Sequence, residues 1–267
     1  MVEYLLEDMA TAYGLYSAQG HVSQLALRRY EEFLEALGES DKLLDLAGIK
    51  YVLVEKGTEL PGYTKVYASG GHEVYENESV LPRAFVVYDA EVISSEQAVL
   101  SRLQSESFDP GLAVILEEEP IPAQDLGGRL ATQAAGSSSF PSTGDVYLPL
   151  VARAWPPLPK FALYSPHKVV IEAELQADGF LVLTDTFYPG WQVFVDGQEG
   201  RIYQADYLFR AVALPRGKHT VEFRYSPPSF RTGLVVSLAA AVLLLAIVVS
   251  SSLNRRRKRR GAPPQDV

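Results

Sequence analysis

The chain of 267 residues contains no cysteine. Disulfides and cysteine-ligated metals are therefore excluded, although this absence does not fix the compartment. There are four histidines, and none has a partner at metal-ligand spacing. The sequence also lacks GxSxG, P-loop and GxGxxG patterns. The motifs consequently assign no catalytic residue, no metal and no cofactor, and the acidic run Glu117–Glu119 offers only a weak alternative as a cation site.

Outside the last fourteen residues, basic residues are outnumbered by acidic ones. Residues 254–267, NRRRKRRGAPPQDV, carry six Lys or Arg and one Asp, a net charge of +5. Because the whole chain has a formal charge of −9, the remainder carries −14. An acidic body argues against a nucleic-acid-binding protein. The tail alone resembles a nuclear-localisation or RNA-binding patch, but it follows directly on an apolar run.

The apolar run covers residues 232–253, TGLVVSLAAAVLLLAIVVSSSL, and contains no charged residue. As a helix, its roughly 22 residues would extend roughly 33 Å, enough to cross a hydrocarbon core of about 30 Å. A buried core helix is disfavoured, because no face of this run is polar. We therefore predict one C-terminal transmembrane helix.

Positive charge is retained in the cytoplasm, so the basic residues after the span predict a cytoplasmic tail and an extracytoplasmic body. The residues that determine this topology are Arg255, Arg256, Arg257, Lys258, Arg259 and Arg260. The N-terminus, MVEYLLEDMATAYG, has no basic n-region or long apolar stretch, so it is no signal peptide. A tail-anchored topology would instead move six positive charges across the membrane. We therefore expect the chain to be the C-terminal piece of a longer membrane protein whose earlier spans deliver the body outside.

The first half of the chain predicts an α+β fold. An amphipathic helix is expected over residues 23–37 with Ser23 as N-cap, and a second from Ser40 to Gly48. Strands are expected at 49–56, 83–93 and 112–118, with a hairpin turning at Gly70 and Gly71. Ser94 and Gln97 resemble a capping box that starts a helix.

The second half changes to an all-β pattern. Alternation in KVVIEAEL indicates a half-exposed strand, whereas FLVLT indicates a strand buried on both faces. Further strands with turn signals between them predict an antiparallel β-sandwich. SPPSFRTG, residues 226–233, would be a stiff spacer before the span.

The predicted domain organisation has five parts. They are a mixed α+β extracytoplasmic region at 1–123, a Gly/Ser/Pro-rich linker at 124–160, a β-sandwich at 161–226 open to strands from 1–123, the transmembrane helix at 232–253 and the basic tail at 254–267.

The stretch DTFYPGWQVFVDG, residues 185–197, is the best candidate for a ligand site. Phe187, Tyr188 and Trp191 would stack on a sugar ring and Asp185 would bind its hydroxyl groups. The alternative is that Trp191 packs in the sandwich core, because it shares one strand face with Val193 and Val195. This period-2 pattern favours core packing.

An ordered set of segments resembles the bacterial YfhO-type membrane proteins. The segments are LLDLAGIKYVLV, VYENESVLPRAFVV, FDPGLAVILEE, PGWQVFVDG and YLFRAVALPRGKHTVEFRYSPPSFRTG, followed by a terminal span. The resemblance covers nearly the whole chain and implies a multi-spanning glycosyltransferase of the GT-C type. Such enzymes take a polyprenyl-phosphate-linked sugar as donor on the outer membrane face, and this family is linked to cell-surface polymers such as teichoic acids.

The catalytic carboxylate of GT-C enzymes lies in their first extracytoplasmic loop, which this chain lacks, so no catalytic residue is carried over. The chain would be the extracytoplasmic domain and last span of such an enzyme, in contact with the lipid bilayer and not catalytic by itself. One alternative is a non-catalytic, membrane-anchored β-sandwich that binds a surface glycan or a protein partner. Another is a structural module that shields the active site.

Overall fold

The computed structural model describes residues 27–38, 40–121 and 158–260. The chain divides into two compact units. The larger unit comprises Met1–Tyr188 and Gln192–Arg224, and the second, called the span unit below, comprises Pro189–Trp191 and Tyr225–Val267. The predicted linker at 124–160 lies, up to residue 157, outside the described residues.

The larger unit contains a six-stranded sheet with the order β4-β9-β13-β12-β6-β5. Its strands are β4 (Ala84–Val87), β5 (Asp89–Val92), β6 (Ala113–Leu116), β9 (Gly179–Leu183), β12 (Tyr203–Ala205) and β13 (Phe209–Leu214). Neighbouring strands pair antiparallel except β5 and β6, which are parallel and are joined through helix α4 (Glu96–Gln104). The sheet takes strands from both sides of the predicted linker.

The single strand predicted over residues 83–93 was wrong. The chain bends at Tyr88, and β4 and β5 lie at opposite edges of the six-stranded sheet. The bend lies beside Gly179 on β9, where a Cβ atom would come within 2.6 Å of the Val87 carbonyl oxygen. The strand-forming pattern of residues 83–93 could not reveal this break, because both halves are strands and only their partners differ.

A five-stranded sheet has the order β11-β10-β14-β8-β7. Its strands are β7 (Lys160–Ser165), β8 (Lys168–Leu175), β10 (Trp191–Val195), β11 (Gln198–Glu199) and β14 (Gly217–Tyr225). In β8 the apolar residues of the predicted alternation, Val169, Ile171, Ala173 and Leu175, are all buried. The period-2 prediction for this strand is confirmed.

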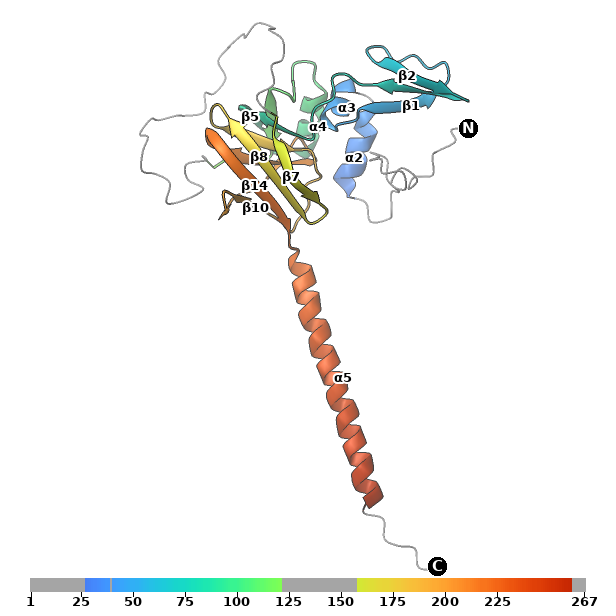
Figure 1. The fold of residues 1–267 in the computed structure, drawn as a ribbon, viewed down its shortest axis with the longest axis vertical. Coiled ribbons are helices and arrows are strands. Elements are labelled where there is room, and N and C mark those ends of the chain that lie inside the picture. The colour runs from blue at the N-terminus through green and yellow to red at the C-terminus, as the bar shows by residue number, and fades with distance from the viewer. Residues whose placement is uncertain (1–26, 39, 122–157, 261–267) are drawn as a thin grey trace, which may run out of the picture. The chain divides into compact units, whose positions relative to one another are not determined.

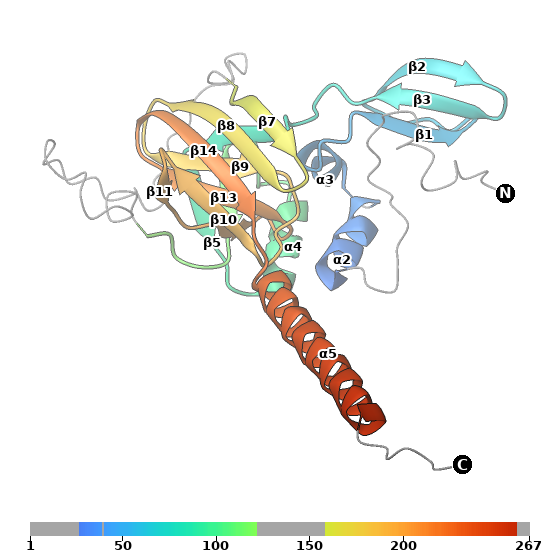
Figure 2. The ribbon, with the colours of Figure 1, turned by 60° about the horizontal axis from the view of Figure 1, so that its bottom comes forward.

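The six-stranded sheet lies between helices and the five-stranded sheet (Figure 2). Helices α2 (Arg28–Leu37), α3 (Asp41–Leu46) and α4 contribute to one core cluster with apolar residues of this sheet. From the opposite face, Arg210 of β13 lies over the Phe223 ring of β14, 5.3 Å from its centroid. This middle position explains why every residue of β9 and β13 is buried. For β9, this confirms the burial on both faces that FLVLT predicted.

A third sheet contains β1 (Tyr51–Glu55), β3 (His72–Glu76) and β2 (Thr64–Ser69), in that order. The predicted hairpin is confirmed, and Gly70 adopts a positive φ of 60° in its turn. The register places Leu53, Val74 and Tyr67 in one row across the three strands. Leu53 and Tyr67 are exposed, so this sheet contributes little to the core.

The helices were predicted more accurately than their N-terminal caps. Ser23 lies outside the described residues, and α2 begins at Arg28. Helix α4 begins after Ser95 rather than Ser94, and Ser95 makes no side-chain cap hydrogen bond, so the predicted capping box was wrong. Glu96 instead pairs with Arg28 and Arg29 of α2. A tertiary ion pair is thus made where the local pattern predicted a cap.

In the span unit, Pro228–Arg260 forms one uninterrupted helix, α5 (Figure 1). Its window Thr232–Ser250 has a mean hydropathy of 2.8 and no residue buried inside the protein, which confirms the predicted apolar helix. The predicted spacer at 226–233 was wrong, since most of it is helical. Proline is well tolerated in the first turn of a helix, where its missing N–H has no intrahelical partner, and Pro228 occupies that position.

Candidate functional site

The structure places Trp191 in the span unit and Asp185 and Tyr188 in the larger unit. Trp191 is half-buried, and its ring lies 5.3 Å from the Tyr225 ring at an interplanar angle of 46°. The expectation that Trp191 is a core residue was wrong, because its side chain is only half-buried. On the same strand face, Val193 is the buried side chain. Tyr188 is 45% exposed.

The Asp185 carboxylate is the centre of a charged cluster that joins the two large sheets. Its Oδ1 accepts hydrogen bonds from Arg83 Nε and from the Tyr164 hydroxyl, both at 3.0 Å. Its Oδ2 accepts a hydrogen bond from Arg210 Nη2 at 2.8 Å. Asp185 follows β9 and Arg210 lies on β13, whereas Tyr164 lies on β7 of the five-stranded sheet. The carboxylate therefore cross-links the layers.

Burial shapes the electrostatics of this Asp185 cluster. The Arg210 side chain is 2% exposed, and burial lowers its pKa. The pKa of Tyr164 is raised to about 12, mainly by burial and to a lesser extent by the negative charge of Asp185. The Tyr164 hydroxyl therefore stays protonated and donates its hydrogen bond to Asp185. Arg83 also lies over the Tyr164 ring, 4.7 Å from its centroid.

This arrangement bears on the predicted ligand role of Asp185. Both carboxylate oxygens already accept hydrogen bonds from within the protein, so a sugar hydroxyl would have to displace one of these donors. Glycan binding by Asp185, Tyr188 and Trp191 remains a prediction. The sequence signal for the cluster was a lone arginine inside the apolar strand LFRAVAL, because a buried guanidinium requires a partner.

A second buried carboxylate lies in the turn between β12 and β13. Asp206 and Tyr207 both have positive φ values, 46° and 70°. Asp206 Oδ1 accepts a hydrogen bond from the Ile115 N–H at 2.8 Å, and the Asp206 N–H donates to the Ile115 carbonyl at 2.8 Å. The side chain is completely buried, and this burial raises its pKa to about 7. It attaches the hairpin to β6.

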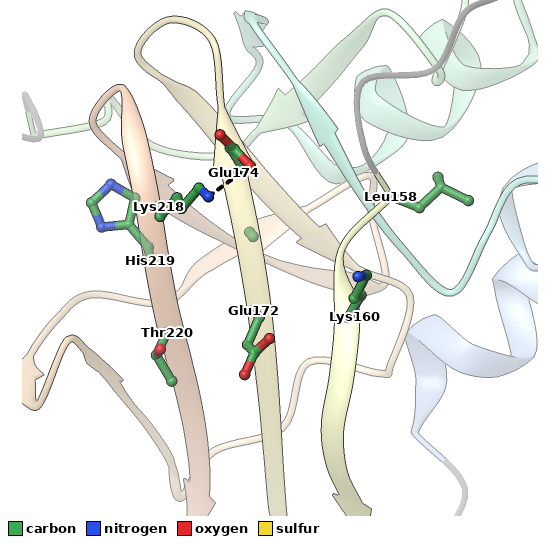
Figure 3. Close-up of a pocket in the computed structure, with 8 residues that line it drawn as sticks. Leu158, Lys160, Glu172, Glu174, Lys218, His219 and Thr220 are labelled. Carbon is green, nitrogen blue, oxygen red and sulfur yellow. Dashed lines mark ion pairs between the residues drawn. The ribbon is translucent and has the colours of Figure 1, made fainter.

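The outer face of the five-stranded sheet forms an open groove of about 350 Å³ (Figure 3). Lys160 of β7, Glu172 of β8 and Thr220 of β14 lie in one cross-strand row, because both outer residues pair with Glu172. Lys218 faces Glu174, with 3.6 Å between Nζ and Oε2. This alternation of charges offers both donors and acceptors to a polar ligand.

Among the described residues, no group of three or more His, Asp or Glu side chains has the geometry to hold a metal ion. In the run Glu117–Glu119, the Glu117 carboxylate accepts a hydrogen bond from Arg29 Nη2 at 2.8 Å, and Glu118 forms an ion pair with Arg201. These two carboxylates therefore have protein cations as partners, which counts against the weak alternative of a cation site.

The comparisons with known proteins concern the C-terminal strands and the start of the span. Residues 160–237 match the family described as "Bacterial membrane protein YfhO". A similar protein is the "Uncharacterized protein YfhO" of Bacillus subtilis (strain 168), with 27% identity over 77 residues. The alignment covers 29% of this chain and 9% of that protein. No solved structure matches. The predicted resemblance to YfhO-type membrane proteins is confirmed for residues 160–237, and for the segments before residue 160 it stays a prediction.

Proposed function

We propose that this chain, which is of the YfhO type over residues 160–237, is the C-terminal extracytoplasmic domain and last span of a larger membrane glycosyltransferase. The observation that supports the proposal most directly is that the match runs from the five-stranded sheet into the apolar helix. The aligned segment is a small part of the Bacillus subtilis protein, which fits a domain that belongs to a much longer polypeptide.

The whole protein would transfer a sugar from a polyprenyl-phosphate-linked donor to a cell-surface polymer in the cell envelope. The resemblance to GT-C enzymes implies this chemistry and assigns the catalytic carboxylate to a loop outside this chain. The larger unit would contribute a folded domain beside the reaction rather than the reacting groups. Its polar groove, together with the span, would then serve to hold substrate or protein near the outer membrane face.

Membrane topology can be tested by single-cysteine labelling, because the chain contains no native cysteine. Glu199→Cys is placed on the exposed strand β11, and Gln265→Cys is placed in the basic tail. We expect a membrane-impermeant maleimide to label Glu199→Cys in intact cells and Gln265→Cys only after permeabilisation. The reverse pattern would refute the extracytoplasmic position of the body, which follows from the basic residues after the span.

The transferase activity requires a test in the organism that encodes the chain. Deletion of the complete gene is expected to remove a glycosyl substituent from a surface polymer and to accumulate the lipid-linked sugar. Chemical analysis of the purified polymer and of the lipid extract measures both effects. Unchanged composition in both fractions would contradict the proposal, and re-expression of the complete gene is the control.

The groove on the five-stranded sheet favours a second candidate function, a non-catalytic module that binds a surface glycan. Glu172 and Glu174 present acceptors for hydroxyl groups on its floor, and Lys160 and Lys218 present donors. Under this alternative, Glu172→Gln with Glu174→Gln should weaken co-sedimentation of the full chain in micelles with cell-wall polymer. Glu199→Gln, on the exposed strand β11, is the matched control.

A further inference from the structure

The residues Pro189–Trp191 belong structurally to the membrane helix, although they precede it by almost forty positions in the sequence. The Gly190 carbonyl accepts a hydrogen bond from the Ser226 N–H at 2.8 Å. A Cβ atom on Gly190 would lie 3.0 Å from Pro227 Cα and 3.2 Å from the Tyr225 ring. The turn is thus in close contact with the three residues that immediately precede α5.

This contact brings aromatic rings together at the N-terminal end of α5, called the head of the span below. Trp191 stacks at an angle on Tyr225, and Phe230, in the first turn of α5, is 69% exposed. We define Trp191, Tyr225 and Phe230 as the aromatic collar. Tryptophan and tyrosine are enriched at membrane–water interfaces, because each combines a large apolar ring with a polar N–H or O–H group.

The length of the apolar part of α5 indicates how deep the aromatic collar lies in the lipid bilayer. The apolar window Thr232–Ser250 has 19 residues, or about 28 Å at 1.5 Å per residue, which nearly matches a hydrocarbon core of about 30 Å. Thr232 therefore lies near the edge of that core. Pro228 is four residues earlier, about 6 Å further out, and the headgroup layer is about 5–7 Å thick.

We propose that the aromatic collar is a lipid-binding site in which Trp191 and Tyr225 lie in the headgroup layer of the bilayer and fix the head of the span. The partner is the phospholipid surface, because the collar is continuous with a helix whose apolar window exposes every residue. This site does not depend on which face of the membrane the body occupies, or on any transferase activity.

The depth of Trp191 can be measured by fluorescence quenching. The chain has two tryptophans, so Trp155→Phe leaves Trp191 as the sole emitter. The full chain is reconstituted into phosphatidylcholine vesicles with lipids brominated either near the headgroup or near the end of the acyl chain. We expect severalfold stronger quenching by the shallow bromines than by the deep ones.

A second variant controls for exposure alone. Trp155→Phe, Trp191→Phe and Tyr67→Trp place the only tryptophan on β2, at a position that is 62% exposed in the larger unit. This residue should be quenched by aqueous acrylamide, and it shows the brominated-lipid quenching of an exposed tryptophan outside the span unit. If Trp155→Phe alters the far-UV circular dichroism, the difference between the native chain and Trp191→Phe yields the same depth measurement.

Two results would overturn the proposal. If neither lipid quenches Trp191, the collar is covered by protein or lies in water. If the deep bromines quench more strongly, Trp191 lies within the hydrocarbon core and not at the interface.

Discussion

Replacing Asp185 by asparagine should destabilise the larger unit strongly. Asparagine keeps the shape of the side chain but removes the negative charge between Arg83 and Arg210. The Arg210 side chain is 2% exposed and the Asp185 side chain 12%, so the guanidinium would keep its positive charge in a buried position. Removal of one partner from a buried ion pair costs about 3–5 kcal/mol of unfolding free energy.

This loss is large enough to measure by urea titration of the full chain in detergent micelles, followed by near-UV circular dichroism. With a slope of about 2 kcal/mol per M, the midpoint should fall by about 1.5–2.5 M. The matched control is Glu118→Gln, which breaks the ion pair with Arg201. Those side chains are 44% and 43% exposed, and exposed pairs contribute about 0–1 kcal/mol.

A double variant separates charge from packing. Asp185→Asn with Arg210→Met removes both buried charges, and apolar replacement of a buried pair is often neutral. It should therefore recover most of the stability that Asp185→Asn loses. The reasoning is refuted if Asp185→Asn lowers the midpoint no more than Glu118→Gln does.

Three further predictions concern buried and close-packed positions. Burial holds the pKa of Asp206 at about 7, so the folded chain keeps a proton that the unfolded chain releases above about pH 4. Stability should fall as pH rises from 4 to 7, by on the order of 1 kcal/mol per pH unit, and Asp206→Asn should remove this slope in urea midpoints measured across that range. Gly179→Ala should lower the free energy of unfolding by about 1–3 kcal/mol in the same assay, because its Cβ would lie 2.6 Å from a backbone oxygen. The control Gly71→Ala, whose Cβ would have no atom within 4 Å, should lower it less. Gly190 has a positive φ of 105°, and its Cβ would lie 3.0 Å from Pro227 Cα. Gly190→Ala should therefore speed exchange of the backbone amide hydrogens at the head of α5. The control Gly197→Ala, at φ 83° with no atom within 4 Å, should not.

The local sequence pattern was sufficient to predict burial wherever buried and exposed positions follow a regular period along the chain. Alternation identified the buried face of β8, and the lack of alternation identified β9 as buried on both faces. It failed for residues 83–93, since β4 and β5 follow each other closely in the chain but have different partners. It also failed for the cap of α4, since the N-cap is Ser95 rather than Ser94 and makes no side-chain hydrogen bond.

The candidate site shows the same division. The sequence drew attention to Asp185 and Trp191, but placed them in one site on the basis of proximity along the chain. Asp185 instead bonds to Arg83, Tyr164 and Arg210, all remote in sequence. Trp191 packs on Tyr225, which is 34 positions away in the sequence.

The sequence by itself determined the apolar helix, the charge asymmetry around it, the α+β class and the resemblance to YfhO-type proteins. Each of these depends on composition or on short-period pattern, which a linear chain displays directly. Only the tertiary structure decided which carboxylates are buried, which strands share a sheet, and that the Pro189–Trp191 turn joins the head of the span. These properties depend on contacts between residues far apart in the chain, and no local period encodes such contacts.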